Sequence, residues 1–266
     1  MFVKPYGAGA EVYLGLHGWG SDHRVFAPLL PSVPPRATFF SADLPGCASS
    51  PAPREWSADA IVAEVVEAIS ALKAQPVTVV GHCGGGVFGL LAAKKAEGII
   101  KRVIMIDPFA YLPRYFRLFI SENFGRHAYN TTFANPFGRW LTNQALSGRR
   151  ESRTDLTASF SSTDHQVARR YLKLFDEMGG VQQFSGLRAG VDLVHGEKSF
   201  GAVRKSVGMF KDTLPHARTW QLKGAGHMPM TEATLQLSRI IFEPETAGIT
   251  VQRNEQHPSL CGESGG

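Results

Sequence analysis

The chain contains 266 residues, has a mass of 29.0 kDa and carries a formal net charge of +5 at pH 7. This length exceeds that of a peptide-sized scaffold and fits one α/β domain, and a composition of 43% hydrophobic and 19% charged residues excludes a disordered, collagen-like or solenoid chain. Residues 111–190 hold 11 Lys/Arg and 6 Asp/Glu, whereas the remainder is balanced at 17 of each. Without a basic stripe or a groove-reading module, the sequence indicates no nucleic-acid partner.

Targeting signals and cysteines further restrict the class of protein to which this chain can belong. No apolar run approaches the roughly 18 residues of a membrane-spanning helix, so we expect no membrane span. The opening MFVKPYGAGA lacks the basic and then apolar order of a secretory signal, and we expect a cytoplasmic protein. Cys47, Cys83 and Cys261 are odd in number and far apart, which fits neither a disulfide framework nor a zinc site. A cysteine with a special role is therefore expected to be a nucleophile.

Short β-rich runs alternate with longer segments of helical period, which predicts a mostly parallel sheet with helices on both faces. The predicted strands are Glu11–Leu16, Ala37–Ala42, Val77–Val80, Val103–Ile106, Val191–Val194 and Arg218–Leu222. The predicted helices are Ala58–Leu72, which Ser57 can cap, Val87–Ala96, Val203–Thr213 and Thr231–Phe242. We expect residues 1–110 and 191–243 to form the core and the polar residues 244–266 to form a flexible tail.

More than eighty residues separate the strands that end at Ile106 and begin at Val191, far more than a connection between a strand and a helix needs. Residues 111–190 are therefore predicted to form a structured helical lid. Nine aromatic residues lie between Tyr111 and Trp140. Such a density also suits an ordinary core, but an insert at the carboxyl edge of a parallel sheet lies where ligands bind. The excess of basic residues suits a solvated surface or a landing area for an acidic ligand or carrier. The expected substrate-binding residues are Tyr111, Tyr115, Phe116 and Phe119.

The segment VTVVGHCGGG, residues 77–86, places Cys83 in a G-x-C-x-G turn between a buried strand and a helix. This is the setting of a nucleophile elbow, in which a strained turn presents the nucleophile above the start of the following helix. The unpaired N–H groups and the dipole of that helix favour a thiolate. A free cysteine can also be a small buried hydrophobic residue, but the pattern of strand, turn and helix favours the nucleophile.

Four motifs occur in one order along the chain: LHGWG after the first predicted strand, DLPG after the next, GHCGG at the turn, and GAGHMP near the end. Their order and spacing resemble the α/β-hydrolase superfamily from Glu11 to Phe242. The resemblance implies the α/β-hydrolase fold, with the helical lid inserted between late strands and a cysteine where most members carry serine. It also implies that His227 is the general base and that the backbone N–H groups of Trp19 and Gly84 form an oxyanion hole.

The acid that would orient His227 is not where many members have it. After the strand Val191–Val194 those members read HGxxD, but this chain reads HGEKS, so that Ser199 occupies the expected aspartate position. Some relatives place the acid after the preceding strand, where this chain has Asp107. We favour Asp107 over Glu197 as the acid, and a Cys-His pair without any acid stays open because thiols ionise readily.

These features predict an acyl-transfer enzyme, namely a thioesterase, esterase or acyltransferase, which forms an acyl-Cys83 intermediate on an apolar acyl substrate. The arginines of the insert could meet the phosphates of coenzyme A or the acidic surface of an acyl carrier protein. One alternative is a non-catalytic ligand receptor or interaction module, which the missing aspartate favours. Another is a lactone or carbon–carbon bond hydrolase, which would need a tight polar pocket. The sequence holds no metal ligand set, phosphate loop or dinucleotide fingerprint, so no metal and no cofactor are expected.

Overall fold

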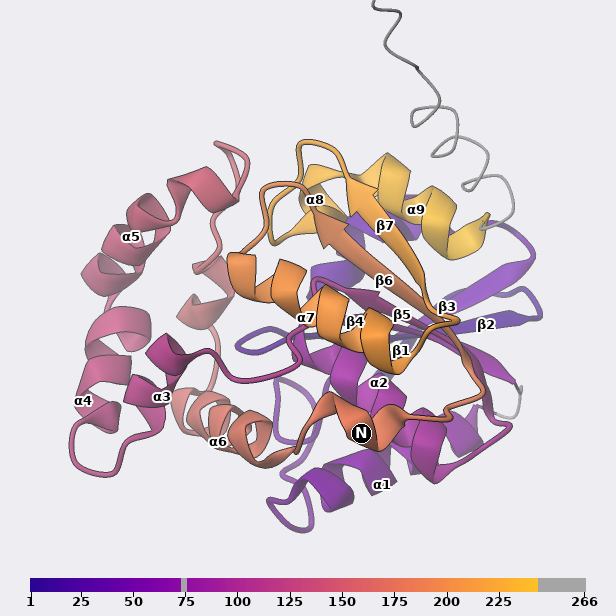
Figure 1. Cartoon of the computed structure of the whole chain (residues 1–266), viewed down its shortest axis with the longest axis horizontal. Coiled ribbons are helices and arrows are strands. Elements are labelled where there is room, and N and C mark those ends of the chain that lie inside the picture. Colours follow the sequence, from indigo (N-terminus) through magenta and orange to yellow (C-terminus); the bar gives the residue numbers. More distant parts are fainter. Residues whose placement is uncertain (73–75, 244–266) are drawn as a thin grey trace, which may run out of the picture.

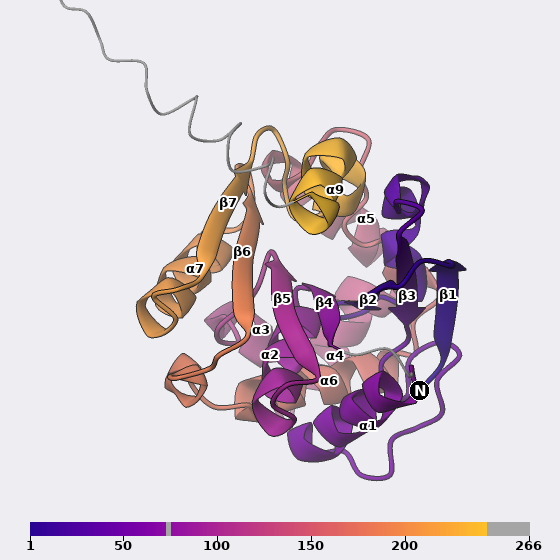
Figure 2. The ribbon, with the colours of Figure 1, turned by 90° about the vertical axis from the view of Figure 1, so that its right-hand side faces the viewer.

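Seven strands form one sheet in the order β1-β3-β2-β4-β5-β6-β7 (Figures 1 and 2). The computed structural model describes residues 1–72 and 76–243, so the predicted tail at 244–266 lies outside the described residues. The strand β1 (Val3–Gly7) pairs antiparallel with β3, and all other neighbours are parallel. The remaining strands are β2 (Glu11–Leu16), β3 (Ala37–Ala42), β4 (Val77–His82), β5 (Ile100–Ile106), β6 (Gly190–Gly196) and β7 (Arg218–Leu222). The predicted mostly parallel sheet is confirmed.

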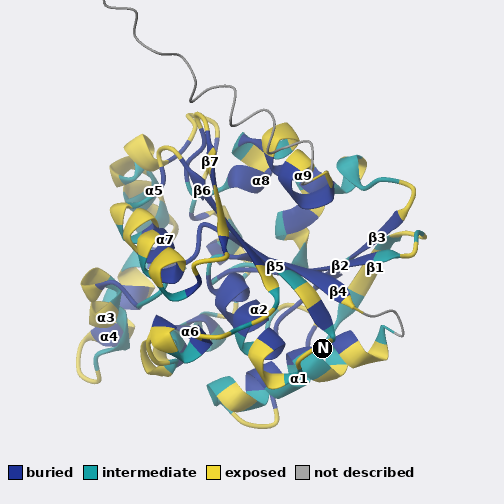
Figure 3. Ribbon diagram, turned by 45° about the vertical axis from the view of Figure 1, so that its right-hand side comes forward, coloured by how far each residue is buried: buried dark blue, intermediate teal, exposed yellow. Residues whose placement is uncertain are grey.

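Alternate residues of the strands enter two cores, one on each face of the sheet, because successive side chains of a strand point in opposite directions. On β4, Val79 belongs to one core and Val80 to the other. The first core is covered by α1 (Ala58–Ala71), α2 (Gly84–Lys95) and α7 (Gly201–Thr213), and the second by η1 (His23–Ser32), α8 (Pro229–Glu232) and α9 (Thr234–Phe242). Figure 3 shows the buried strands between helices with exposed outer faces, which confirms the prediction of helices on both sides.

The structure differs from the predicted elements in several places. The edge strand β1 and the 3-10 helix η1 are additional, and the single helix expected over residues 231–242 is divided into α8 and α9. The division falls at Ala233, whose φ of −141° and ψ of 41° are not helical. The helix α2 begins at Gly84 rather than Val87, so it starts directly after Cys83. The predicted cap of α1 is present, because the Ser57 hydroxyl accepts a hydrogen bond from the Ala60 N–H at 3.2 Å.

Residues 111–190, hereafter the insert, run between β5 and β6 and form mainly short helices at one side of the molecule (Figure 1). Their own small core contains Tyr129, Phe133, Phe160 and Leu172, and Trp19 from the loop after β2 packs against it. The elements are α3 (Arg114–Ile120), α4 (Gly125–Tyr129), η2 (Asn130–Ala134), α5 (Pro136–Ala145), η3 (Ser147–Arg149), η4 (Ala158–Ser161), α6 (His165–Glu177) and η5 (Val181–Phe184). Within residues 1–72 and 76–243, no helix combines the length and apolarity that crossing a membrane requires.

Candidate active site

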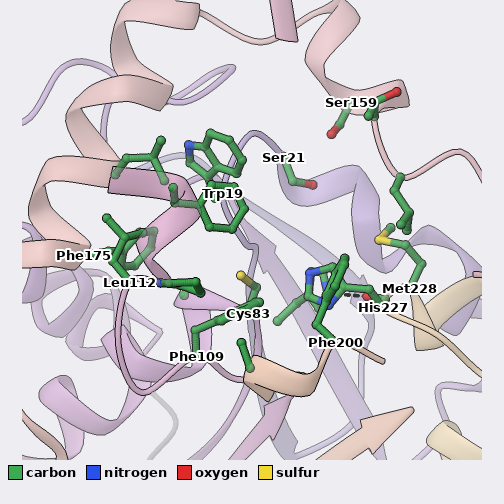
Figure 4. Close-up of a pocket in the computed structure, with 18 of the residues that line it drawn as sticks. Trp19, Ser21, Cys83, Phe109, Leu112, Ser159, Phe175, Phe200, His227 and Met228 are labelled. Atoms are coloured by element: carbon green, nitrogen blue, oxygen red, sulfur yellow. Dashed lines mark hydrogen bonds between the residues drawn. The ribbon is translucent and has the colours of Figure 1, made fainter. Parts of the chain in front are cut away.

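Cys83 lies in a sharp turn between β4 and α2. Its φ of 52° and ψ of −120° are a strained backbone conformation for a residue with a side chain. The flanking glycines are required sterically, because a Cβ atom at Gly81 would lie 2.3 Å from the Gly86 Cα atom and one at Gly85 would lie 2.1 Å from the Leu16 carbonyl oxygen. The turn therefore needs glycine on both sides of Cys83, and it presents the thiol to the pocket shown in Figure 4.

His227 reaches the same pocket from the loop after β7. Its Nδ1–H donates a hydrogen bond of 2.9 Å to Oδ2 of Asp107, which is fully buried at the carboxyl end of β5. Asp107 also accepts hydrogen bonds from the Gly196 N–H at 2.9 Å and from the Ser199 hydroxyl. The serine at the position where the resemblance implies an aspartate thus contacts the carboxylate that orients the ring.

The other carboxylate considered from the sequence lies in a different environment. Glu197 is exposed, and its Oε2 accepts a hydrogen bond of 2.8 Å from the Gly224 N–H. Of the two carboxylates, Asp107 is the one that contacts the His227 imidazole. The three side chains Cys83, His227 and Asp107 come from three separate connections and meet at one edge of the sheet, where the carboxyl ends of parallel strands converge.

The charge environment of His227 is unusual. Burial lowers the pKa of its imidazole, but hydrogen bonds and charge interactions with Asp107 and Cys83 outweigh burial and raise the pKa to about 10. The raised pKa favours the protonated imidazole, and a positive charge beside the Cys83 sulfur would stabilise a thiolate.

His82, which the sequence analysis did not single out, supports the His227 backbone. Its Nε2–H donates a hydrogen bond of 3.0 Å to the His227 carbonyl oxygen. Burial, followed by repulsion from His227, lowers the pKa of His82 to about 3, so this imidazole is neutral and acts as a hydrogen-bond donor. Its position next to Cys83 in the GHC motif was the one signal in the sequence that could have indicated a role.

The two expected oxyanion-hole residues flank Cys83. Gly84 is the first residue of α2, and the N–H groups of a helix's first turn have no acceptor within the helix. The loop that carries Trp19 touches the turn, because a Cβ atom at Gly18 would lie 2.8 Å from the Cys83 Cβ atom. The Trp19 indole has a separate structural role, since its Nε1–H donates a hydrogen bond of 2.8 Å to the Ala168 carbonyl oxygen in α6. The oxyanion role of the two backbone groups stays a prediction.

The pocket above Cys83 has a volume of about 1000 Å³. Both Cys83 and His227 line it, together with many apolar side chains of the insert and the core (Figure 4). The four residues expected to bind substrate are all among the lining residues: Tyr111, Tyr115, Phe116 and Phe119. Their role in substrate binding stays a prediction.

A backbone contact joins the insert to the loop that carries His227. The His227 N–H donates a hydrogen bond of 3.2 Å to the Arg149 carbonyl oxygen. Glu232 supports this contact by binding both segments. Its Oε1 accepts a hydrogen bond from the Glu151 N–H at 2.7 Å, and its Oε2 accepts one from the Gly226 N–H at 2.6 Å. One carboxylate therefore holds the insert and the histidine loop together, and no motif in the sequence pointed to it.

Replacing Glu232 by alanine is expected to lower turnover by about tenfold and the free energy of unfolding by about 2 kcal/mol, since two charge-assisted hydrogen bonds are lost. Glu232→Gln keeps one oxygen acceptor, so its turnover and its free energy of unfolding are expected to lie between those of the wild type and those of Glu232→Ala. Steady-state kinetics and urea unfolding measure the effects, with Glu122→Ala in the insert as the control. Unchanged turnover in a destabilised Glu232→Ala would show that the contact does not position His227.

Within the described part of the chain, one group of side chains, Asp22, His23 and Asp43, has metal-ligand atoms within 4.8 Å of one another. Their atoms already have protein partners. Asp43 Oδ1 accepts from the His23 N–H at 2.7 Å and from its Nδ1 at 2.9 Å, and Asp22 pairs with Arg24 at 2.6 Å. These hydrogen bonds stabilise the loop before η1, and this structural role explains why the three side chains lie together.

Comparison with known sequences identifies proteins that are similar to this chain. It is 35% identical over 117 residues to a pimeloyl-[acyl-carrier protein] methyl ester esterase of Chromobacterium violaceum, covering 44% of this chain and 43% of that protein. It is 31% identical over 104 residues to a serine hydrolase-like protein of Danio rerio, covering 38% and 32%. The matches therefore span less than half of the length of these curated relatives.

Solved structures share the architecture. The enol-lactonase from Burkholderia xenovorans superposes with a TM-score of 0.72 at 16% identity, covering 90% of this chain and 94% of that one. An esterase from Thermogutta terrifontis gives a TM-score of 0.72 at 16% identity, covering 96% and 94%. At these identities the likeness concerns the fold alone. A family model described as the alpha/beta hydrolase fold matches residues 14–234. With the sheet order, the turn at Cys83 and this match over most of its length, the chain belongs to the α/β-hydrolase family.

Proposed function

We propose that the protein is an acyl-transfer enzyme, acting as a thioesterase, esterase or acyltransferase, with Cys83 as nucleophile, His227 as acid and base and Asp107 as the orienting acid. The observation that carries the proposal is the imidazole of His227, which hydrogen-bonds to the buried Asp107 carboxylate at 2.9 Å and whose pKa is raised to about 10 by Asp107 and Cys83. A cysteine paired with an imidazolium is the activated nucleophile that acyl transfer requires.

The chemistry follows from this pairing. The Cys83 thiolate attacks the acyl carbon, a C–S bond forms, and the carbonyl oxygen takes the negative charge. The N–H groups of Trp19 and Gly84 would stabilise that charge. Collapse breaks the bond between the acyl carbon and the leaving group, which takes a proton from the His227 imidazolium. A water molecule or another acceptor then attacks the thioester while His227, now neutral, accepts its proton.

Asp107 would keep the imidazole in one orientation through both steps. The carboxylate also accepts hydrogen bonds from the Gly196 N–H and the Ser199 hydroxyl, so it is itself held in place. A receptor that had lost turnover was suggested by the missing aspartate at position 199. The contact between Asp107 and His227 supports the enzyme over that alternative.

The pocket supports an apolar acyl substrate. Its volume of about 1000 Å³ and its aromatic lining suit a chain of several carbons rather than the small ring product of a lactone or carbon–carbon bond hydrolase. The insert, which carries most of these aromatic residues, would act as the lid. Several relatives have names that specify an ester on an acyl carrier protein, and the insert holds the excess of basic residues, so we propose that the acyl group is delivered on such a carrier or on coenzyme A.

Incubation with octanoyl thioesters and intact-protein mass spectrometry tests the proposal. The expected result is one octanoyl group per chain, which peptide mapping assigns to Cys83. No acyl group on Cys83 with any thioester or ester, despite a folded protein, would reject it.

A further inference from the structure

The pocket extends to both sides of Cys83, and on the side beside His227 two serine hydroxyls lie among apolar side chains that include Phe200. In Figure 4, Phe175 and Leu112 lie on one side of the Cys83 sulfur, whereas His227 and Met228 lie on the other side together with Ser21 and Ser159. The residues come from the insert, the loop after β2 and the histidine loop. A substrate bound across Cys83 would therefore place one of its halves beside these two hydroxyls.

The apolar side continues into the first core of the sheet. Phe175 lies directly against the start of α2, since a Cβ atom at Gly84 would come within 1.9 Å of its ring. It packs against the same core as Val181 and Phe184, which are almost completely buried and also line the pocket. Methylene groups that enter this side replace water against buried hydrocarbon, which suits an alkyl chain.

The side beside His227 offers hydrogen-bonding groups. Ser21 and Ser159 line the pocket and are half-buried, and their hydroxyls make no hydrogen bond to another group among residues 1–72 and 76–243. Two other hydroxyls that line the pocket are already engaged, because Ser162 donates to the Ser159 carbonyl oxygen and Thr157 donates to Asp155. Two free hydroxyls in one part of a pocket can donate to or accept from a ligand.

Reaction chemistry determines which half of the substrate lies on which side. The leaving atom must lie within reach of the imidazolium that protonates it, so the leaving group extends to the side of His227. The acyl chain then extends to the opposite side, toward Phe175. This orientation requires only the proton transfer and the positions of the side chains in Figure 4.

We propose that the substrate is a thioester or ester of an apolar acid whose leaving group carries amide or hydroxyl groups close to the scissile bond, and that Ser21 and Ser159 bind these groups. The assignment rests on the proposed acyl-transfer function. In the step, the Cys83 sulfur bonds to the acyl carbon, the bond from that carbon to the leaving sulfur or oxygen breaks, and the His227 proton passes to the leaving atom. The products are acyl-Cys83 and a neutral thiol or alcohol.

A matched pair of thioesters tests the assignment: octanoyl-N-acetylcysteamine, whose leaving group has an amide, and S-pentyl thiooctanoate, whose leaving group has the same chain length without one. The wild type is expected to have a kcat/KM about tenfold higher for the amide thioester. Ser21→Ala and Ser159→Ala should each raise KM for it by about fivefold, the loss of one hydrogen bond, and leave the pentyl thioester unchanged. Ser152→Ala, a serine of the insert outside the pocket, is the control.

The acyl side is tested with the same leaving group on butanoyl and dodecanoyl chains. Val181→Phe should lower kcat/KM for the dodecanoyl substrate by about tenfold relative to the butanoyl substrate, and thermal unfolding identifies any variant that fails to fold. Equal rates for the two octanoyl thioesters, or serine variants that behave like Ser152→Ala, would overturn the assignment while acyl-Cys83 still forms. The absence of acyl-Cys83 with every substrate would instead reject the proposed function itself.

Discussion

Replacing Cys83 by serine is expected to lower kcat/KM for acyl substrates by about 10²- to 10³-fold while the fold is kept. The side chains are nearly the same size, so the turn with its positive φ is not further strained. The hydroxyl is not ionised at neutral pH, and His227 must remove its proton in the step of attack, whereas a thiolate is already charged. Cys83→Ala, which has no nucleophile, is expected to lose about 10⁴-fold or more.

Cys47 provides a matched control for this prediction. It is half-buried and lies outside the pocket that contains Cys83. Burial, with a smaller contribution from Asp43, raises the pKa of the Cys47 thiol to about 12, so it is expected to resist iodoacetamide at neutral pH while Cys83 is alkylated. Steady-state kinetics and peptide mapping should show unchanged turnover for Cys47→Ser. Turnover of Cys83→Ser at the rate of the wild type would contradict thiolate chemistry.

Replacing Asp107 by asparagine is expected to reduce turnover by about 10²- to 10³-fold, because an amide can hold the imidazole in the wrong tautomer and cannot stabilise the imidazolium. The buried position makes the change severe, since Asp107 also accepts from Gly196 and Ser199. Glu197→Gln is the control, because its contact with the Gly224 N–H survives in an amide oxygen. If Glu197→Gln were the variant that lost activity, the acid would have to be reassigned.

The variant Asp107→Asn is also expected to change how the free energy of unfolding depends on pH. The pKa of His227 is raised in the folded state to about 10, above its ordinary value of roughly 6.5. The stabilisation from its proton is therefore complete below pH of roughly 6.5 and is lost as the pH rises through about 10. Asp107→Asn lowers the pKa of His227, so the decline of unfolding free energy between these pH values should become shallower. Urea unfolding at several pH values measures it, and a decline as steep as in the wild type would argue against this coupling.

Local sequence was sufficient for most of the sheet and for two of the candidate catalytic residues. The continuous apolar run at β4 and the glycines around Cys83 are local consequences of burial and of a sharp turn, so each can be recognised within ten residues. The edge strand β1 escaped prediction because VKPYG is short, mostly exposed and contains Pro5 and Gly7, which are rare within strands, and its strand conformation comes from pairing with β3. The break at Ala233 was likewise invisible in an otherwise helical pattern.

The sequence by itself determined the alternation of strands and helices, the family and the turn that carries Cys83, since these depend on patterns within short stretches of chain. Only the tertiary structure shows which of Asp107 and Glu197 contacts the His227 imidazole, because Asp107 and His227 are 120 residues apart and meet only where the ends of β5 and β7 lie at the same edge of the sheet. It also places Ser199 against Asp107, Glu232 between the insert and the histidine loop, and Ser21 on the same side of Cys83 as Ser159 (Figure 4). Such contacts join segments whose proximity depends on how all the layers pack, and no local pattern of residues encodes it.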